Sequence, residues 1–209
     1  MANPARFRDV ADISSHYAAD TPVMLVLSAP QGVTNDLVAL VSAAQQGGDW
    51  QAALDSLQAR FEALIIDADP ALPEYERHAL LQAARDQVQV LADYAKGIAL
   101  LQHCPDPVQA RMLGTGEQFS VALMTASLKA RGLDAGALDA TRLVKSQGDY
   151  LNASADIPST IAAFTERKAQ GLPRISVMAG FVSGLPHGET ALLGRNGSDY
   201  SAAIIAAGS

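Results

Sequence analysis

Three short polar segments of this sequence, each containing glycine, stand directly before an apolar helical stretch. They are SAPQGVTN (28–35), GTGEQFS (114–120) and GRNGSD (194–199). A helix start presents unpaired backbone N–H groups and the positive end of the helix dipole, and glycine lets a ligand approach that backbone closely. The three segments therefore indicate a small-molecule site built from helix N-termini in an α/β protein.

The side chains of these segments suit a ligand that carries both signs of charge. Arg195 offers a planar guanidinium that fits a carboxylate or a phosphate. Glu117 and Asp199 offer acceptors for an ammonium group. A free amino acid makes both demands, so these three residues are candidates for binding or catalysis.

Several of these residues also have a structural interpretation, which the sequence leaves open. Thr34 is suited to the N-cap of the helix that follows it, and Asp199 to the cap of the last helix. Glu117, in a first helical turn, would interact favourably with the helix dipole. Arg195 has no comparable explanation, because its glycine-rich surroundings offer its side chain little packing.

Common catalytic signatures are absent from the sequence. It contains no Gly-x-x-x-x-Gly-Lys-[Ser/Thr] phosphate loop and no Gly-x-Ser-x-Gly elbow. The four histidines are scattered, so no metal site is predicted. Cys104 is the single cysteine, which excludes an internal disulfide, and we interpret it as a structural residue despite its neighbour His103.

Composition and charge narrow the class of protein. A length of 209 residues fits one domain, and an apolar content of 49% supports a sizeable core. The net charge of −7, without a run of Lys or Arg, argues against nucleic acid or an anionic membrane as the main partner. No apolar run approaches the roughly 20 residues of a membrane span, and no signal peptide is evident, so we expect a cytoplasmic protein.

Apolar patterning predicts the elements that position the three segments. The continuous apolar runs at 22–30 and 173–181 are typical of strands buried on both faces of a parallel sheet. Strands alternate with helices, so we expect a three-layer αβα sandwich with a mostly parallel sheet. The other predicted elements are helices at 5–19, from Thr34 to Gly47, within 114–132 with Glu117 in the first turn, and at 156–170, a short strand at 133–138 and a small helix within 139–151.

Residues 49–104 form a helical feature of their own. Apolar side chains step by three and four along two stretches, with Pro70 and Pro73 between them. The pattern predicts a helical hairpin that packs on the sheet or projects as a lobe. Pro105 and Pro107 are expected to end it, with a short turn leading to the second polar segment.

In combination, the motifs resemble the amino acid kinase family, and the aspartate kinases in particular. VLSAPQGVTN (26–35) resembles the first substrate loop, and GEQFS (116–120) the Gly-Glu-x-x-Ser element. AGF (179–181) followed by LGRNGSDYSAA (193–203) resembles the most specific signature of the family. The match covers nearly the whole chain, and its Arg-Asn-Gly variant and helical segment 49–104 are most similar to bifunctional aspartokinase–homoserine dehydrogenases.

The resemblance implies ATP-dependent phosphorylation of the side-chain carboxylate of L-aspartate to 4-phospho-L-aspartate, with Mg²⁺, in a homo-oligomer. This is the first step toward lysine, threonine and methionine. By position, Arg195 would clamp a substrate carboxylate and, with Asp199, carry catalysis, while Glu117 and Asp199 would face the α-ammonium. The implied substrate-binding residues are Ser28, Thr34, Glu117, Phe181, Arg195, Ser198 and Asp199.

Two family motifs are not in the printed sequence. They are a strand with Lys-Phe-Gly-Gly-[Ser/Thr]-Ser, whose lysine neutralises the transferring phosphate, and a Thr-Asp-Val-Asp-Gly nucleotide-binding loop. We therefore expect residues 1–209 to represent the substrate-binding part of the catalytic domain, with a helical insertion at 49–104 and no identified ATP-binding residues. Weak or no kinase activity and a tendency to self-associate are the corresponding expectations.

Two alternatives to this function stay open at this point. One is a non-catalytic aspartate-binding or assembly fragment. The other is a related family kinase that acts on glutamate, acetylglutamate or a nucleotide. The SAPQGVTN loop (28–35) disfavours the second, because it resembles the aspartate enzymes specifically.

Overall fold

The computed structural model describes residues 3–194 and 197–208. A parallel sheet of three strands lies at its centre, in the order β1-β5-β2. These strands are β1 (Val23–Leu27), β5 (Ile175–Ala179) and β2 (Ala135–Leu138). The prediction of an α/β fold around a parallel sheet is confirmed.

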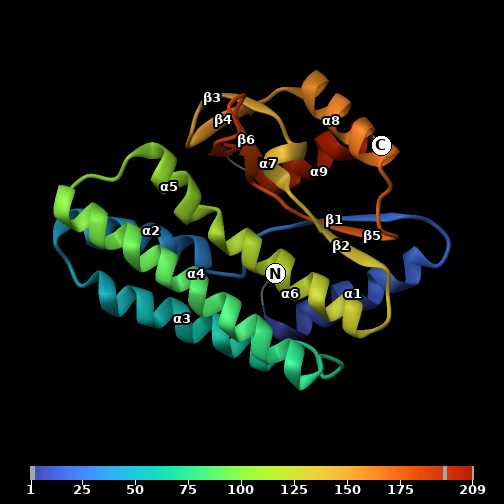
Figure 1. Ribbon diagram of the computed structural model, residues 1–209, viewed down its shortest axis with the longest axis horizontal. Helices are drawn as coiled ribbons and strands as arrows, with labels where there is room; N and C mark the ends of the chain where they lie inside the picture. Colours follow the sequence, from blue (N-terminus) through green and yellow to red (C-terminus); the bar gives the residue numbers. More distant parts are fainter. Residues whose placement is uncertain (1–2, 195–196, 209) are drawn as a thin grey trace.

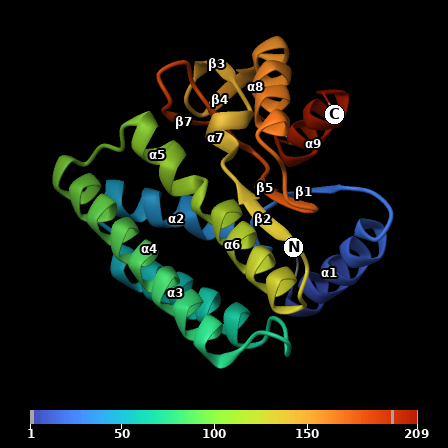
Figure 2. The same ribbon diagram turned by 45° about the vertical axis from the view of Figure 1, so that its right-hand side comes forward.

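Helices cover both faces of this sheet (Figures 1 and 2). On one face lie α1 (Pro4–Ala18) and α6 (Thr115–Ala130). On the other face, α9 (Gly197–Gly208) contacts β1, with α8 (Ile157–Ala169) beside it. All of β5 is buried between the two layers, as predicted for 173–181.

The edge strand β1 differs from its prediction. Its side chains from Val23 to Val26 are only half-buried, so the expectation of a strand at 22–30 that is buried on both faces is wrong. An edge strand has a neighbouring strand on one side only, and its flanking helices cover it incompletely. A continuous apolar run therefore predicted the strand but not its position in the sheet.

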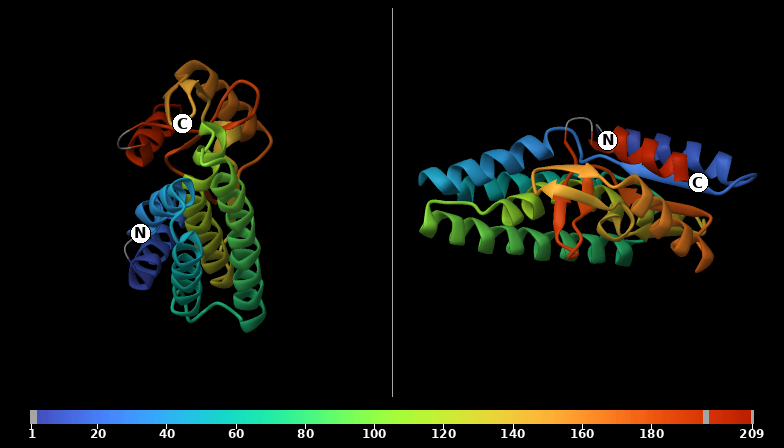
Figure 3. Two further views of the ribbon diagram at one scale, coloured as in Figure 1. Left: turned by 90° about the vertical axis from the view of Figure 1, so that its left-hand side faces the viewer. Right: turned by 90° about the horizontal axis from the view of Figure 1, so that it is seen from above.

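The predicted hairpin at 49–104 is present as α3 (Trp50–Ile66) and α4 (Glu74–Leu101). Asp49 caps α3 by accepting a hydrogen bond from the N–H of Ala52 at 2.9 Å. The hairpin packs on α2 (Val33–Gln46) and α6, and it reaches the sheet through these helices (Figures 1 and 3). It is thus an additional helical layer on the α6 side of the molecule.

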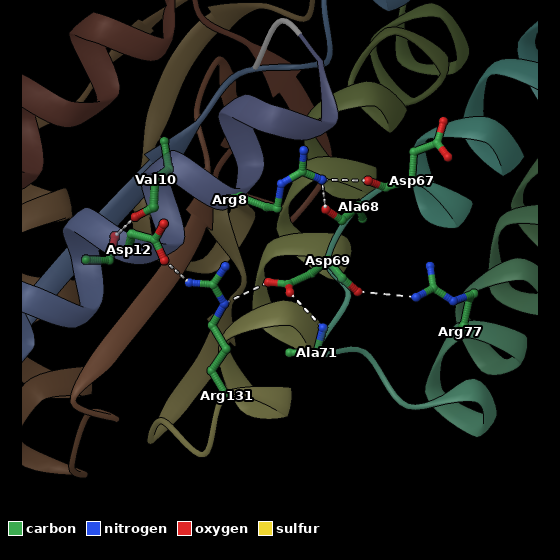
Figure 4. A network of polar contacts seen from close by, with 10 residues as sticks. Arg8, Val10, Asp12, Asp67, Ala68, Asp69, Ala71, Arg77 and Arg131 are labelled. Atoms are coloured by element: carbon green, nitrogen blue, oxygen red, sulfur yellow. Dashed lines mark hydrogen bonds and ion pairs between the residues drawn. The ribbon is translucent and has the colours of Figure 1, made fainter.

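The loop between α3 and α4 is fastened to the rest of the molecule by three arginines (Figure 4). At the end of α6, Arg131 donates from Nε to Asp69 at 2.7 Å and also pairs with Asp12 of α1. Arg8 of α1 and Arg77 of α4 donate to backbone carbonyls of the same loop and the end of α3. Through Arg131, the network holds the C-terminal end of α6, the helix whose first turn contains Glu117.

Some short elements were not predicted. A helix, α5 (Asp106–Leu113), replaces the expected turn after the hairpin, because Pro107 lies in its first turn, where proline is tolerated. Two antiparallel hairpins were also missed, since strands of three or four residues are too short for a periodic pattern. They are β3 (Ser146–Asp149) with β4 (Asn152–Ala155), and β6 (Val182–Gly184) with β7 (Thr190–Leu192); the small helix α7 (Ala140–Leu143) was expected.

Two further sequence expectations concern Cys104 and the membrane. Cys104 is buried, and this burial raises the pKa of its thiol, as fits a structural residue. Within residues 3–194 and 197–208, no helix combines the length and apolar character that a bilayer crossing needs.

Candidate functional site

A cavity of about 630 Å³ lies where the carboxyl ends of β1 and β5 meet the starts of α2, α6 and α9. The edge of a parallel sheet beyond the strands' carboxyl ends is the usual ligand site of α/β folds. Arg195 lies outside the described residues. The other six predicted site residues all line this cavity: Ser28, Thr34, Glu117, Phe181, Ser198 and Asp199.

Glu117 is the buried carboxylate of the cavity, with 3% of its surface exposed. The N–H of Ala29 donates to its Oε1 at 3.2 Å, whereas Oε2 has no hydrogen-bond partner in the described part of the chain. Burial raises the pKa of Glu117 to about 7, although the bond from Ala29 opposes this. A buried acceptor with one unsatisfied oxygen favours a cationic hydrogen-bond donor in the cavity.

Glycine at position 116 is what brings Glu117 to this place. A Cβ on Gly116 would lie 2.7 Å from Cβ of Ala29 and 2.9 Å from Cγ1 of Val33, closer than packed carbons allow. The start of α6 can therefore touch the loop after β1 only if residue 116 has no side chain. The GEQFS motif is explained by this contact between two distant segments.

Thr34 is not the N-cap of α2, so the structural interpretation of this residue is wrong. Gly32, with a left-handed φ of 84°, occupies the cap position, and the helix begins at Val33. The hydroxyl groups of Thr34 and Ser28 make no hydrogen bond with any described residue. Both are free to bind a ligand in the cavity.

Phe181 follows β5 in a backbone conformation that is uncommon for a residue with a side chain. Its φ of 64° lies in the left-handed region. Its N–H donates to Oγ of Ser201 at 3.2 Å, and its carbonyl accepts from the N–H of Leu193 at 2.8 Å. These two bonds offset a conformational cost of about 1–2 kcal/mol and fix the aromatic wall of the cavity.

The start of α9 packs against this turn through glycines. A Cβ on Gly180 would lie 2.7 Å from Cα of Ser198, and one on Gly197 would lie 2.6 Å from Cδ2 of Phe181. Glycine at both positions thus brings Ser198 and Asp199 to the cavity wall. Asp199 lies within the first turn of α9, so the expectation that it caps this helix is wrong.

Sequence reasoning missed the wall formed by the β3–β4 hairpin. Leu151 and Asn152 line the cavity, together with Leu193 and Gly194. No motif in the sequence marks this hairpin, because its strands are too short to show a pattern. Only the packing of β4 beside β7 brings Asn152 to the site.

The comparisons with known proteins agree with the fold. The family model described as the amino acid kinase family matches residues 1–208, so the chain belongs to that family. Among its members, the chain is similar to aspartokinases, including the kinase region of bifunctional aspartokinase/homoserine dehydrogenases, as the motifs predicted.

The relatives give the extent of this similarity. The chain is 32% identical to bifunctional aspartokinase/homoserine dehydrogenase 2 of Escherichia coli, over 99% of this chain and 24% of that protein. It is 30% identical to the bifunctional enzyme of Haemophilus influenzae, over 99% and 25%. The chain therefore spans about a quarter of the length of these relatives.

A solved structure shows the same fold. Aspartokinase III of E. coli, in complex with aspartate and ADP, superposes with a TM-score of 0.83 at 24% identity. The match covers 99% of this chain and 44% of that chain. The three-strand parallel sheet and its flanking helices are thus the fold of an aspartokinase over that part of the structure.

The lining residues of the cavity fit an amino acid better than ATP or a metal ion. They supply two carboxylates, the hydroxyls of Ser28, Thr34 and Ser198, and the amide of Asn152. Of the described lining residues none is Lys or Arg, the side chains that bind a triphosphate. The part of the chain that the structure describes also contains no group of three His, Cys, Asp or Glu residues placed to hold a metal, and we assign no residue to ATP or Mg²⁺.

Proposed function

We propose that this chain forms the amino-acid-binding part of an aspartate kinase. In the reaction, an oxygen of the side-chain carboxylate of L-aspartate takes the γ-phosphoryl group of ATP, which gives 4-phospho-L-aspartate and ADP. Membership of the amino acid kinase family and the aspartate held by E. coli aspartokinase III support this function. The observation that carries it is the buried Glu117, with Oε2 unpartnered at the wall of the cavity.

The proposed roles follow from the chemistry of the lining residues. Glu117 accepts a hydrogen bond from the α-ammonium of aspartate, and Asp199 provides a second acceptor. Arg195, which follows the cavity-lining Gly194 in sequence, binds a carboxylate through its guanidinium. The remaining hydrogen bonds to the substrate carboxylates come from the hydroxyl groups of Ser28, Thr34 and Ser198.

Catalysis in this proposal consists of positioning and charge neutralisation. Arg195 holds the reacting carboxylate, Asp199 holds the ammonium group beside it, and Phe181 restricts the substrate to one side of the cavity. Phosphoryl transfer requires little covalent chemistry from the protein, because the donor and the acceptor only need to be held in line.

Calorimetric titration with L-aspartate and with succinate tests the proposal. Succinate has both carboxylates but lacks the ammonium group. We expect L-aspartate to bind more tightly than succinate, because only L-aspartate satisfies Oε2 of Glu117. Glu117→Gln is expected to weaken L-aspartate binding by about tenfold or more and to leave succinate binding nearly unchanged.

Glu62→Gln is the matched control, since Glu62 pairs with Arg85 on the helical hairpin and does not line the cavity. This variant should bind both ligands like the wild type. Absence of L-aspartate binding by the wild type would contradict the proposal, and a preference for L-glutamate would change its substrate. Aspartate-dependent release of ADP from ATP measures the reaction itself. L-aspartate binding without release of ADP would favour the non-catalytic alternative.

A further inference from the structure

The β3–β4 hairpin is a fixed part of the cavity wall. The N–H of Leu192 in β7 donates to the carbonyl of Tyr150 at 2.7 Å, and Ala153 forms a parallel bridge with Leu193. At the other end of the hairpin, the hydroxyl of Ser183 donates to that of Ser146 at 2.9 Å. Figure 2 shows β3, β4 and β7 side by side. The residues of the turn are therefore held in position for a ligand.

Asn152 presents its side-chain amide to the cavity next to Gly194. A Cβ on Gly194 would lie 2.4 Å from Oδ1 of Asn152, so the glycine lets the amide keep this position beside it. The amide makes no hydrogen bond with any residue in the described ranges. Gly194 therefore admits an unpaired donor and acceptor group into the site.

The chemistry of the proposed reaction indicates which substrate group meets this amide. The ammonium belongs at Glu117, which is almost completely buried. The side-chain carboxylate must face the open side, because a separate phosphoryl donor has to reach it. Asn152 lines the cavity and is exposed to solvent, so its amide is accessible to a group on the open side.

We propose that Asn152 determines substrate specificity by donating a hydrogen bond from its amide to the side-chain carboxylate of the amino acid. This inference rests on the proposed function. A neutral amide can donate a hydrogen bond to a carboxylate and also to the acyl phosphate formed from it. It can therefore position the reacting group before and after the transfer.

The test compares L-aspartate with L-asparagine as ligands of Asn152→Asp. The new carboxylate repels the side-chain carboxylate of L-aspartate and accepts from the amide of L-asparagine. We expect L-aspartate binding to weaken about tenfold or more, whereas L-asparagine binding is unchanged or stronger. Because no hydrogen bond within the described chain is lost, the melting temperature should not change.

Gln147→Glu adds the same charge to the same hairpin, at an exposed position outside the cavity, and should alter neither affinity. Equal affinities of the wild type and Asn152→Asp for L-aspartate would overturn this inference and leave the proposed function standing. An equal loss of affinity of Asn152→Asp for L-aspartate and for L-asparagine would also overturn this inference, because it would indicate a structural role for Asn152. A wild type that binds no L-aspartate would overturn the proposed function and this inference together.

Discussion

Two buried carboxylates in this molecule, Asp69 and Glu117, have the same exposure and opposite surroundings. Asp69 is 4% exposed and Glu117 is 3% exposed. Each oxygen of Asp69 has a partner, since Arg131 donates at 2.7 Å and the N–H of Ala71 at 2.9 Å (Figure 4). Glu117 receives one hydrogen bond, from Ala29, and its second oxygen has no partner in the described chain.

Burial alone therefore does not distinguish a structural carboxylate from one that binds a ligand. A buried carboxylate whose partners come from the chain fastens elements together, as Asp69 joins the hairpin loop to α6. A buried carboxylate that lacks a partner destabilises the free protein, and a ligand that donates a hydrogen bond to it removes this cost and binds more tightly.

The largest expected effect comes from removing the satisfied acid. Asp69→Ala removes two hydrogen bonds to a buried carboxylate, from Arg131 and from the N–H of Ala71, while Arg131 keeps its pair with Asp12. The free energy of unfolding should fall by about 3–5 kcal/mol. Urea denaturation measures the change. Asp67→Ala in the same loop, where the side chain is exposed, should change stability by no more than about 0.5 kcal/mol. Similar losses in the two variants would contradict the role given to Asp69.

The second prediction concerns the pH dependence of stability that Glu117 causes. The pKa of Glu117 rises from an ordinary value of 4.5 to about 7 on folding, so the folded state binds more protons between these pH values. Stability should therefore fall as pH rises through this range, by about 3 kcal/mol in total. Glu117→Gln removes this contribution, and its stability should exceed that of the wild type above pH 7. Denaturation curves at pH 5 and pH 8 measure it, and an unchanged difference between the two proteins would refute it.

The smallest expected effects compare one glycine from each region. Gly116→Ala forces a methyl group against Ala29 and Val33, which should cost about 1–3 kcal/mol and weaken ligand binding as α6 moves. Gly97→Ala in α4 meets no atom within 4 Å and should stabilise the helix by about 0.5–1 kcal/mol. Thermal melting of both variants is the measurement. A stabilising Gly116→Ala would show that the start of α6 does not need its close contact.

Much of the helical region could be predicted because its signals are local. The apolar rows of α3 and α4 repeat every three to four residues, and Pro70 and Pro73 separate them. The start of α8 was predicted too, at Asp156, and the structure shows that this residue caps the helix by accepting from the N–H of Ser159 at 3.0 Å. In contrast, the hairpin of β3 and β4 has no such pattern, and the half-buried state of β1 depends on neighbours that the strand itself does not specify.

The sequence alone predicted which residues of this protein could bind a zwitterion and that three polar segments form one site. Gly116 and Gly180 directly precede the candidate site residues Glu117 and Phe181 in the sequence. The order of the motifs indicated the family to which the chain belongs. Other features depend on tertiary contacts. Asn152 lines the cavity, and Thr34 lies inside α2 and does not cap it. Both oxygens of Asp69 have a hydrogen-bond partner, whereas only one oxygen of Glu117 has a partner in the described chain. The physical reason is that hydrogen-bond satisfaction and burial depend on contacts between distant segments, whereas caps, turns and helical periodicity are properties of adjacent residues.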